Sequence, residues 1–209
     1  MKTLILKFSE IPSFLIILNM NIGFDLDRVL INYPPFLPSR VLDRLYKERD
    51  NGILIYRIPT YPEQWMRKSI HFPLLRQPIK ENLSFLRSIP KDTNKLYLIS
   101  SRYKFLQKIT ERLVKRYDLD KIFDELYFNF ENKQPHTFKS ALIKKLKLDV
   151  YVDDDLSLIR HAAKDNPATT FFWLNYSGQK NPVAKNIFAI TKLSEIFQDV
   201  SLKIHDVRK

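Results

Sequence analysis

Short apolar runs alternate with amphipathic stretches of helical period along most of the 209-residue chain, and this alternation constrains the fold more than any other feature. The apolar runs, which we expect to be strands, lie at 21–24, 53–58, 95–99, 149–152 and 169–174. The segment 119–128 predicts a short turn of helix followed by a further strand. The stretches that predict helices lie at 39–49, 62–69, 79–88, 104–116, 137–146, 156–164 and 193–198. Strands that alternate with helices in this way predict an α/β fold with a doubly wound, mainly parallel sheet.

Composition removes several classes of function. Only three glycines occur, Gly23, Gly52 and Gly178, so neither a phosphate-binding G-x-x-x-x-G-K-[ST] loop nor a G-x-G-x-x-G dinucleotide turn can be written. The absence of cysteine excludes disulfide scaffolds, zinc ribbons and thiol nucleophiles. The four histidines are too widely spaced for a short metal-binding motif.

The chain is strongly basic. Thirty-five Lys and Arg residues against 23 Asp and Glu give a formal charge of +12, which predicts attraction to phosphorylated substrates, nucleic acid or acidic membranes. Much of the excess is lysine in 139–147, which suits a solvated helix face, and no arginine-rich tract or RNP-type aromatic motif supports nucleic-acid binding.

The first 19 residues are apolar but interrupted by Lys7, Glu10 and Pro12, so we expect neither a membrane span nor a signal peptide there. We interpret 1–19 as an extension upstream of a domain that starts at Met20. We expect a cytoplasmic protein that does not bind a membrane.

Acidic residues follow two of the predicted strands. Asp25 and Asp27 come directly after 21–24 and, two residues apart in an extended chain, lie on the same side. Asp153, Asp154 and Asp155 follow the strand at 149–152. Carboxylates this close to one another require a nearby cation or a shared proton. Because two strand ends of a parallel sheet both carry carboxylates, the sequence predicts one Mg²⁺ site between them.

Groups suited to a phosphoryl oxygen occur between these acids. Ser100 ends the strand at 95–99, and Lys139 lies in the helix before the second acidic cluster. A hydroxyl donor and an ammonium group match the negative charge that develops during phosphoryl transfer.

This ordered set resembles the four motifs of the haloacid dehalogenase-like hydrolase superfamily. The matching parts are D-x-D-x-V at 25–29, Ser100, Lys139 and a strand that ends in Asp153 and Asp154, and the resemblance spans roughly 20–200. It implies a Mg²⁺-dependent phosphatase. Asp25 would attack phosphorus and form an aspartyl-phosphate, and Asp27 would act as general acid and base.

The resemblance also implies a ligand set. Asp25, the backbone carbonyl of Asp27 and Asp154 would hold Mg²⁺ with Asp153 beside it, while Ser100 and Lys139 would bind the phosphoryl oxygens. The register within 153–155 is open by one residue, which leaves Asp155 as a spare ligand, and Lys144 is an alternative to Lys139. One departure is Arg28, because many members have glycine there.

The long segment between Asp27 and Ser100 predicts a small cap at 33–76, inserted into a core domain formed by 20–32 and 77–209. In the resembling enzymes such a cap selects the substrate. Its aromatic and basic residues suit either a nucleotide or the cap's own core. We therefore expect a small phosphorylated metabolite as substrate, with a 5′-nucleotidase-like phosphatase and a non-catalytic nucleic-acid-binding module on the same fold as alternatives.

Overall fold

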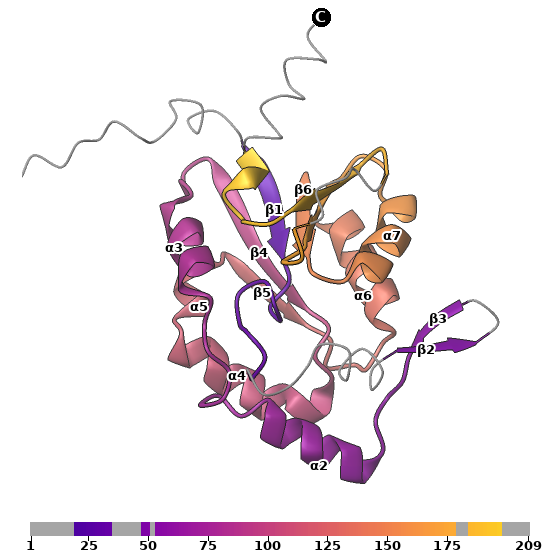
Figure 1. Ribbon diagram of the computed structural model, residues 1–209. Coiled ribbons are helices and arrows are strands. Elements are labelled where there is room, and N and C mark those ends of the chain that lie inside the picture. The colour runs from indigo at the N-terminus through magenta and orange to yellow at the C-terminus, as the bar shows by residue number, and fades with distance from the viewer. Residues whose placement is uncertain (1–18, 35–46, 51–52, 179–183, 198–209) are drawn as a thin grey trace, which may run out of the picture.

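The computed structural model describes residues 19–34, 47–50, 53–178 and 184–197, and its centre is a six-stranded sheet (Figure 1). The strands are β1 (Met20–Phe24), β4 (Asn94–Ser100), β5 (Glu125–Phe128), β6 (Val150–Asp153), β7 (Thr170–Leu174) and β8 (Ile187–Ile190). Their order is β5-β4-β1-β6-β7-β8, and every neighbouring pair is parallel. The predicted doubly wound parallel sheet is confirmed.

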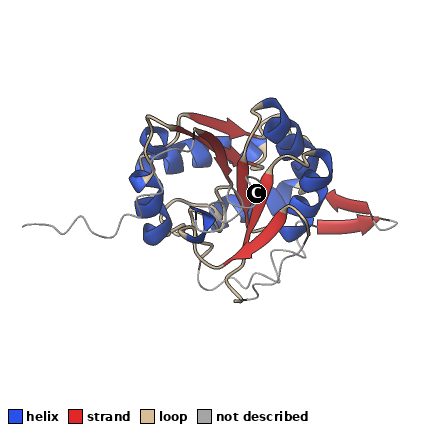
Figure 2. Cartoon of the chain, turned by 90° about the horizontal axis from the view of Figure 1, so that it is seen from above, coloured by secondary structure: helices blue, strands red, loops and turns tan. Residues whose placement is uncertain are grey.

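Helices cover both faces of this sheet, as the view from above shows (Figure 2). One hydrophobic core lies between the sheet and α3 (Lys80–Ser88), α4 (Gln107–Arg116) and α5 (Leu119–Ile122). The other lies between the sheet and α6 (Pro135–Lys145) and α7 (Leu156–Asp165). A 3₁₀ turn, η2 (Lys104–Leu106), precedes α4. Burial on both faces explains why the central strands are continuous apolar runs.

Side chains of β1 alternate between the two cores. Ile22 and Phe24 point into the core beneath α3 and α5, whereas Gly23 faces Tyr151 of β6. A Cβ atom at position 23 would lie 2.8 Å from Cδ2 of Tyr151 and 2.5 Å from Cδ1 of Leu148. Glycine is therefore needed at this position so that the Tyr151 ring can pack across β1.

The described residues between β1 and α3 form a hairpin and one helix. β2 (Lys47–Asp50) pairs antiparallel with β3 (Ile53–Tyr56), and α2 (Tyr61–Ile70) follows. The helix expected at 39–49 is wrong for 47–49, which lie in β2, while 39–46 lie outside the described residues. Asp50 pairs with Ile53, so β2 and β3 form an antiparallel hairpin, and residues 51 and 52 between them lie outside the described residues.

The proposed N-terminal extension lies outside the described residues, except for its last residue. Within the described ranges, none of the helices has the length and apolar character needed to cross a bilayer. The boundaries of the cap stay a prediction.

Candidate active site

Neighbouring strand ends bring the two acidic clusters together. β1 and β6 pair in parallel with Phe24 opposite Val152, and the backbone N–H of Asp25 continues the ladder by donating to the carbonyl of Val152 at 2.9 Å. Asp25 and Asp153 consequently leave the sheet side by side. Ser100 ends β4, which flanks β1 on the other side.

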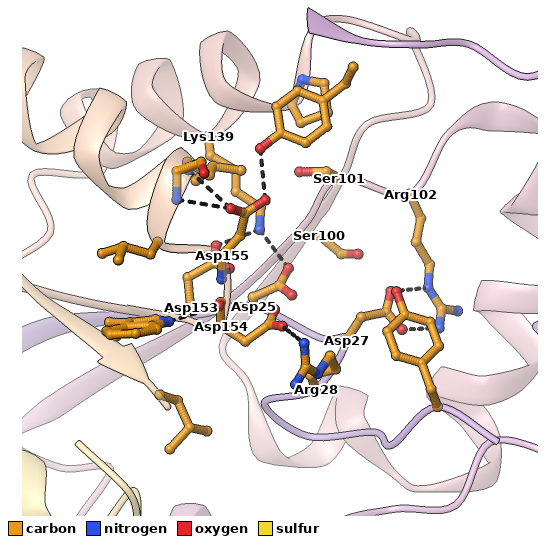
Figure 3. Close-up of a pocket in the computed structure, with 18 of the residues that line it drawn as sticks. Asp25, Asp27, Arg28, Ser100, Ser101, Arg102, Lys139, Asp153, Asp154 and Asp155 are labelled. Atoms are coloured by element: carbon orange, nitrogen blue, oxygen red, sulfur yellow. Dashed lines mark hydrogen bonds and ion pairs between the residues drawn. The ribbon is translucent and has the colours of Figure 1, made fainter. Parts of the chain in front are cut away.

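A buried lysine bridges these carboxylates. Nζ of Lys139, on α6, lies 2.7 Å from Oδ1 of Asp25 and 2.7 Å from Oδ2 of Asp153 (Figure 3). Burial opposes the charge on Lys139, but the two carboxylates outweigh it and hold the pKa of the ammonium group well above its usual value. Burial raises the pKa of Asp25 to about 7, against the effect of Lys139. Lys144, the alternative from sequence, is exposed on the same helix.

The three consecutive aspartates of 153–155 have different surroundings. Asp153 accepts hydrogen bonds from Lys139, the Tyr151 hydroxyl at 3.1 Å and the backbone N–H of Asp155 at 2.9 Å. Asp154 forms an ion pair with Arg28, Oδ2 to NH1 at 3.1 Å. Burial and the nearby Asp153 raise the pKa of Asp154 well above its usual value.

Asp155 is used as a helix cap. Its Oδ1 accepts the backbone N–H groups of Ser157 and Leu158 at 3.0 and 3.3 Å, at the start of α7. Its Oδ2 accepts the Tyr56 hydroxyl at 2.8 Å. By contrast, carboxylate oxygens of Asp25, Asp153 and Asp154 all lie within 4.8 Å of one another, so these three are the candidate ligands for a hard cation.

The side chain of Asp27 lies apart from that group, between two arginines. Nε and NH2 of Arg102 lie 2.8 Å from its two carboxylate oxygens, and NH2 of Arg76 also contacts Oδ1. Figure 3 shows the contact between Arg102 and Asp27. Burial opposes ionisation of Asp27, yet Arg102 and Arg76 hold its pKa far below the usual value. In this arrangement Asp27 is a carboxylate, and its side chain is not part of the group formed by Asp25, Asp153 and Asp154.

A cavity of about 430 Å³ joins these groups. Its wall includes the carboxylates of 25, 27 and 153–155, as well as Lys139, Ser100 and Ser101. The hydroxyls of Ser100 and Ser101 are buried and have no hydrogen-bond partner among the described residues. Such groups are available to an anion in the cavity.

Comparisons of sequence detect no relative, because no family model and no curated protein matches the chain. Comparisons of structure do. A haloacid dehalogenase-like family hydrolase from Xanthomonas campestris covers 91% of this chain and 98% of its own, with TM-score 0.55 and 13% identity. A protein assigned as a beta-phosphoglucomutase from Thermotoga maritima covers 88% and 99%, with TM-score 0.52 and 20% identity. The chain has the haloacid dehalogenase-like fold.

A third solved structure with this fold contains ligands. It is an aspartate-to-alanine variant of a haloacid dehalogenase family enzyme from Bacteroides thetaiotaomicron, in complex with magnesium and inorganic phosphate. It covers 77% of this chain and 95% of its own, with TM-score 0.50 and 13% identity.

The sequence did not indicate that arginines contact the side chain of Asp27. Arg102 follows Ser100 in the chain, and Arg67 lies in the predicted cap, but nothing in the pattern shows that they are buried. Arg76 has no motif around it. Trp173 is half-buried on the cavity wall, where its Nε1 donates to the carbonyl of Asp154 at 3.0 Å.

Proposed function

We propose that the protein is a Mg²⁺-dependent phosphatase that hydrolyses a small phosphorylated substrate through an aspartyl-phosphate on Asp25. The observation that supports this most is the bridge from Lys139 to Asp25 and Asp153, at 2.7 Å each, beside two unpartnered serine hydroxyls. These groups supply a nucleophile, an acidic cation site and donors for phosphoryl oxygens in one cavity. The Bacteroides structure with magnesium and phosphate shows that this fold can bind both.

The donor set fits Mg²⁺. Asp25, Asp153 and Asp154 offer carboxylate oxygens within 4.8 Å of one another, and hard divalent cations prefer such oxygens. When bound, Mg²⁺ would neutralise negative charge on the phosphoryl group and on the carboxylates around it.

In the proposed reaction Asp25 is the nucleophile and Asp27 is the general acid and base. The Asp25 carboxylate attacks phosphorus, an Asp25–phosphorus bond forms, and the bond to the leaving oxygen breaks as Asp27 gives that oxygen a proton. Water then attacks the aspartyl-phosphate, its proton passes to Asp27, and the Asp25 carboxylate is released. Since Asp27 is held as a carboxylate by Arg76 and Arg102, the first step requires that it leave them and gain a proton.

Two groups would stabilise the transferring phosphoryl group. The Ser100 hydroxyl is buried at the end of β4 and can donate to one oxygen. Lys139 adds positive charge that is already oriented by Asp25 and Asp153. Such preorganised donors strengthen most as charge develops in the transition state.

The test is hydrolysis of an aryl phosphate with Mg²⁺ or with a chelator. We expect turnover that requires the metal and is lost in Asp25→Asn, while Asp92→Asn, an exposed aspartate outside the cavity, behaves like the native protein. Acid quenching followed by peptide mass spectrometry should locate one phosphoryl group on the peptide that contains Asp25. Equal turnover by Asp25→Asn would overturn the proposal.

A nucleoside monophosphate is a second candidate substrate, because the rings of Tyr33 and Tyr56 line the cavity. Faster turnover of nucleoside monophosphates than of aryl phosphates would select it. A salt-sensitive complex with nucleic acid, without hydrolysis of any phosphate ester, would instead favour the non-catalytic module.

A further inference from the structure

Two buried arginines share one carboxylate beside the cavity. Arg76 and Arg102 are 0% and 5% exposed, and both bind Asp27. In the described ranges neither forms an ion pair with a second acidic side chain. Buried charges are normally paired one to one, so this pair carries one positive charge more than its partner neutralises.

Part of this excess charge faces the cavity. Arg102 lines the same cavity as Asp25 and Lys139, together with Arg67 of α2, whose side chain is also almost fully buried. Arg76 lies behind Asp27, with its guanidinium carbon 4.1 Å from the centre of the Tyr33 ring. The wall of the cavity near Asp27 is therefore cationic, while the wall near Asp153 and Asp154 is acidic.

The contact between Arg102 and Asp27 has the form of a binding contact. Nε and NH2 of Arg102 each lie 2.8 Å from one carboxylate oxygen, which is the two-pronged geometry by which arginine binds carboxylates and phosphates. In Figure 3 Asp27 faces Arg102, whereas Asp25 faces Lys139. A general acid at position 27 has to leave this contact, and its departure would leave Arg102 buried without a counter-charge.

We propose that Arg102, supported by Arg76 and Arg67, binds a second anionic group of the substrate, a carboxylate or a phosphate, in exchange for Asp27. This inference rests on the proposed phosphatase function and specifies its substrate class: phosphate monoesters that carry a second anionic group. When the second anionic group of the substrate replaces Asp27, the charge of Arg102 stays neutralised. Asp27 can then reach the leaving oxygen, and this happens only when the correct substrate is bound. Binding energy of the remote anion thus assembles the catalytic groups, a form of induced fit.

The test uses phosphonates, which cannot be hydrolysed, so that binding is measured apart from turnover. Calorimetry on the full-length protein with Mg²⁺ would compare three series of increasing chain length: ω-carboxyalkyl, ω-hydroxyalkyl and bis-phosphonates. We expect a doubly anionic series to bind about tenfold more tightly than the hydroxyl series at its best length, as one charge-assisted hydrogen-bonded contact allows. If the ω-carboxyalkyl series binds more tightly than the hydroxyl series, the second anionic group is a carboxylate. If the bis-phosphonates do, it is a phosphate.

Variants make the test specific. Arg102→Gln should abolish the preference for the doubly anionic series, whereas Arg87→Gln, an exposed arginine on α3 outside the cavity, should retain it. Asp27→Asn removes the competing carboxylate and should increase the preference, a gain that misfolding does not produce.

The outcomes separate the two proposals. Equal binding of charged and neutral phosphonates, or an unchanged preference in Arg102→Gln, overturns this inference and leaves the phosphatase intact. Absence of binding by every phosphonate overturns the proposed function, and this inference with it.

Discussion

NH1 of Arg28 lies 3.1 Å from Oδ2 of Asp154, so a residue that directly follows the D-x-D motif neutralises a candidate cation ligand on the neighbouring strand. Arg28 reaches this position from a left-handed backbone conformation, with φ of 60°. Glycine adopts that conformation without a steric penalty. The turn after Asp27 could therefore hold the glycine that many haloacid dehalogenase-like proteins have at this position. In this chain Arg28 places a positive charge there instead.

Arg28→Gly should therefore tighten Mg²⁺ binding. The guanidinium competes with a cation for Asp154, and its removal should lower the dissociation constant by roughly twofold to fivefold, the size of a partly exposed ion pair. Calorimetric titration with Mg²⁺ measures this change. Arg28→Lys, which keeps the charge, is the control, and weaker binding in the glycine variant would contradict the competition.

Lys139→Met should remove activity and lower stability. It leaves Asp25 and Asp153 facing each other in a buried position without their shared cation, and breaking a buried ion pair in this way costs about 3–5 kcal/mol of unfolding free energy. Urea unfolding without metal would show the loss. The matched control is Lys144→Met, an exposed lysine on the same helix, for which we expect little change. Equal effects of the two substitutions would show that the bridge does not stabilise the fold.

The stabilising effect of Asp27 should depend on pH. Its pKa in the folded protein is far below the ordinary value because of Arg102 and Arg76, so its contribution is present above the unfolded pKa and is lost as pH falls. The unfolding free energy of the native protein should exceed that of Asp27→Asn at neutral pH, and the gap should narrow toward about pH 3. Urea unfolding at several pH values measures the gap. A gap that widens on acidification would contradict the assignment.

Local patterns predicted the sheet and the residues at its carboxyl edge. Apolar runs such as 95–99 are visible because both faces of the sheet are covered, and carboxylates stand out directly after such runs. Contacts between distant segments could not be inferred in this way. Arg76 and Arg102 meet at Asp27 only after three segments have packed together, and in the sequence each is one basic residue among 35.

The same limit explains the wrong helix at 47–49 and the open register within the acidic cluster. Lys47–Asp50 has polar residues that suit a helix end, and only pairing with Ile53–Tyr56 makes it a strand. The three aspartates of 153–155 are equivalent in sequence. Their surroundings distinguish them, because Asp155 caps α7 and binds the Tyr56 hydroxyl, while Asp153 and Asp154 lie near Asp25.

Substitutions within this cluster should follow these surroundings. Asp155→Asn keeps a good N-cap for α7, since asparagine caps helices about as well as aspartate, and should change Mg²⁺ affinity by no more than about threefold. Asp154→Asn removes a carboxylate from the candidate cation site and should weaken Mg²⁺ binding by about tenfold or more, as loss of a charged ligand implies. Calorimetric titration of both variants decides the register, and thermal unfolding confirms that both are folded. If Asp155→Asn lost Mg²⁺ while Asp154→Asn kept it, the cation site would have to include Asp155 in place of Asp154, with the capping hydrogen bonds to Ser157 and Leu158 given up when the metal binds.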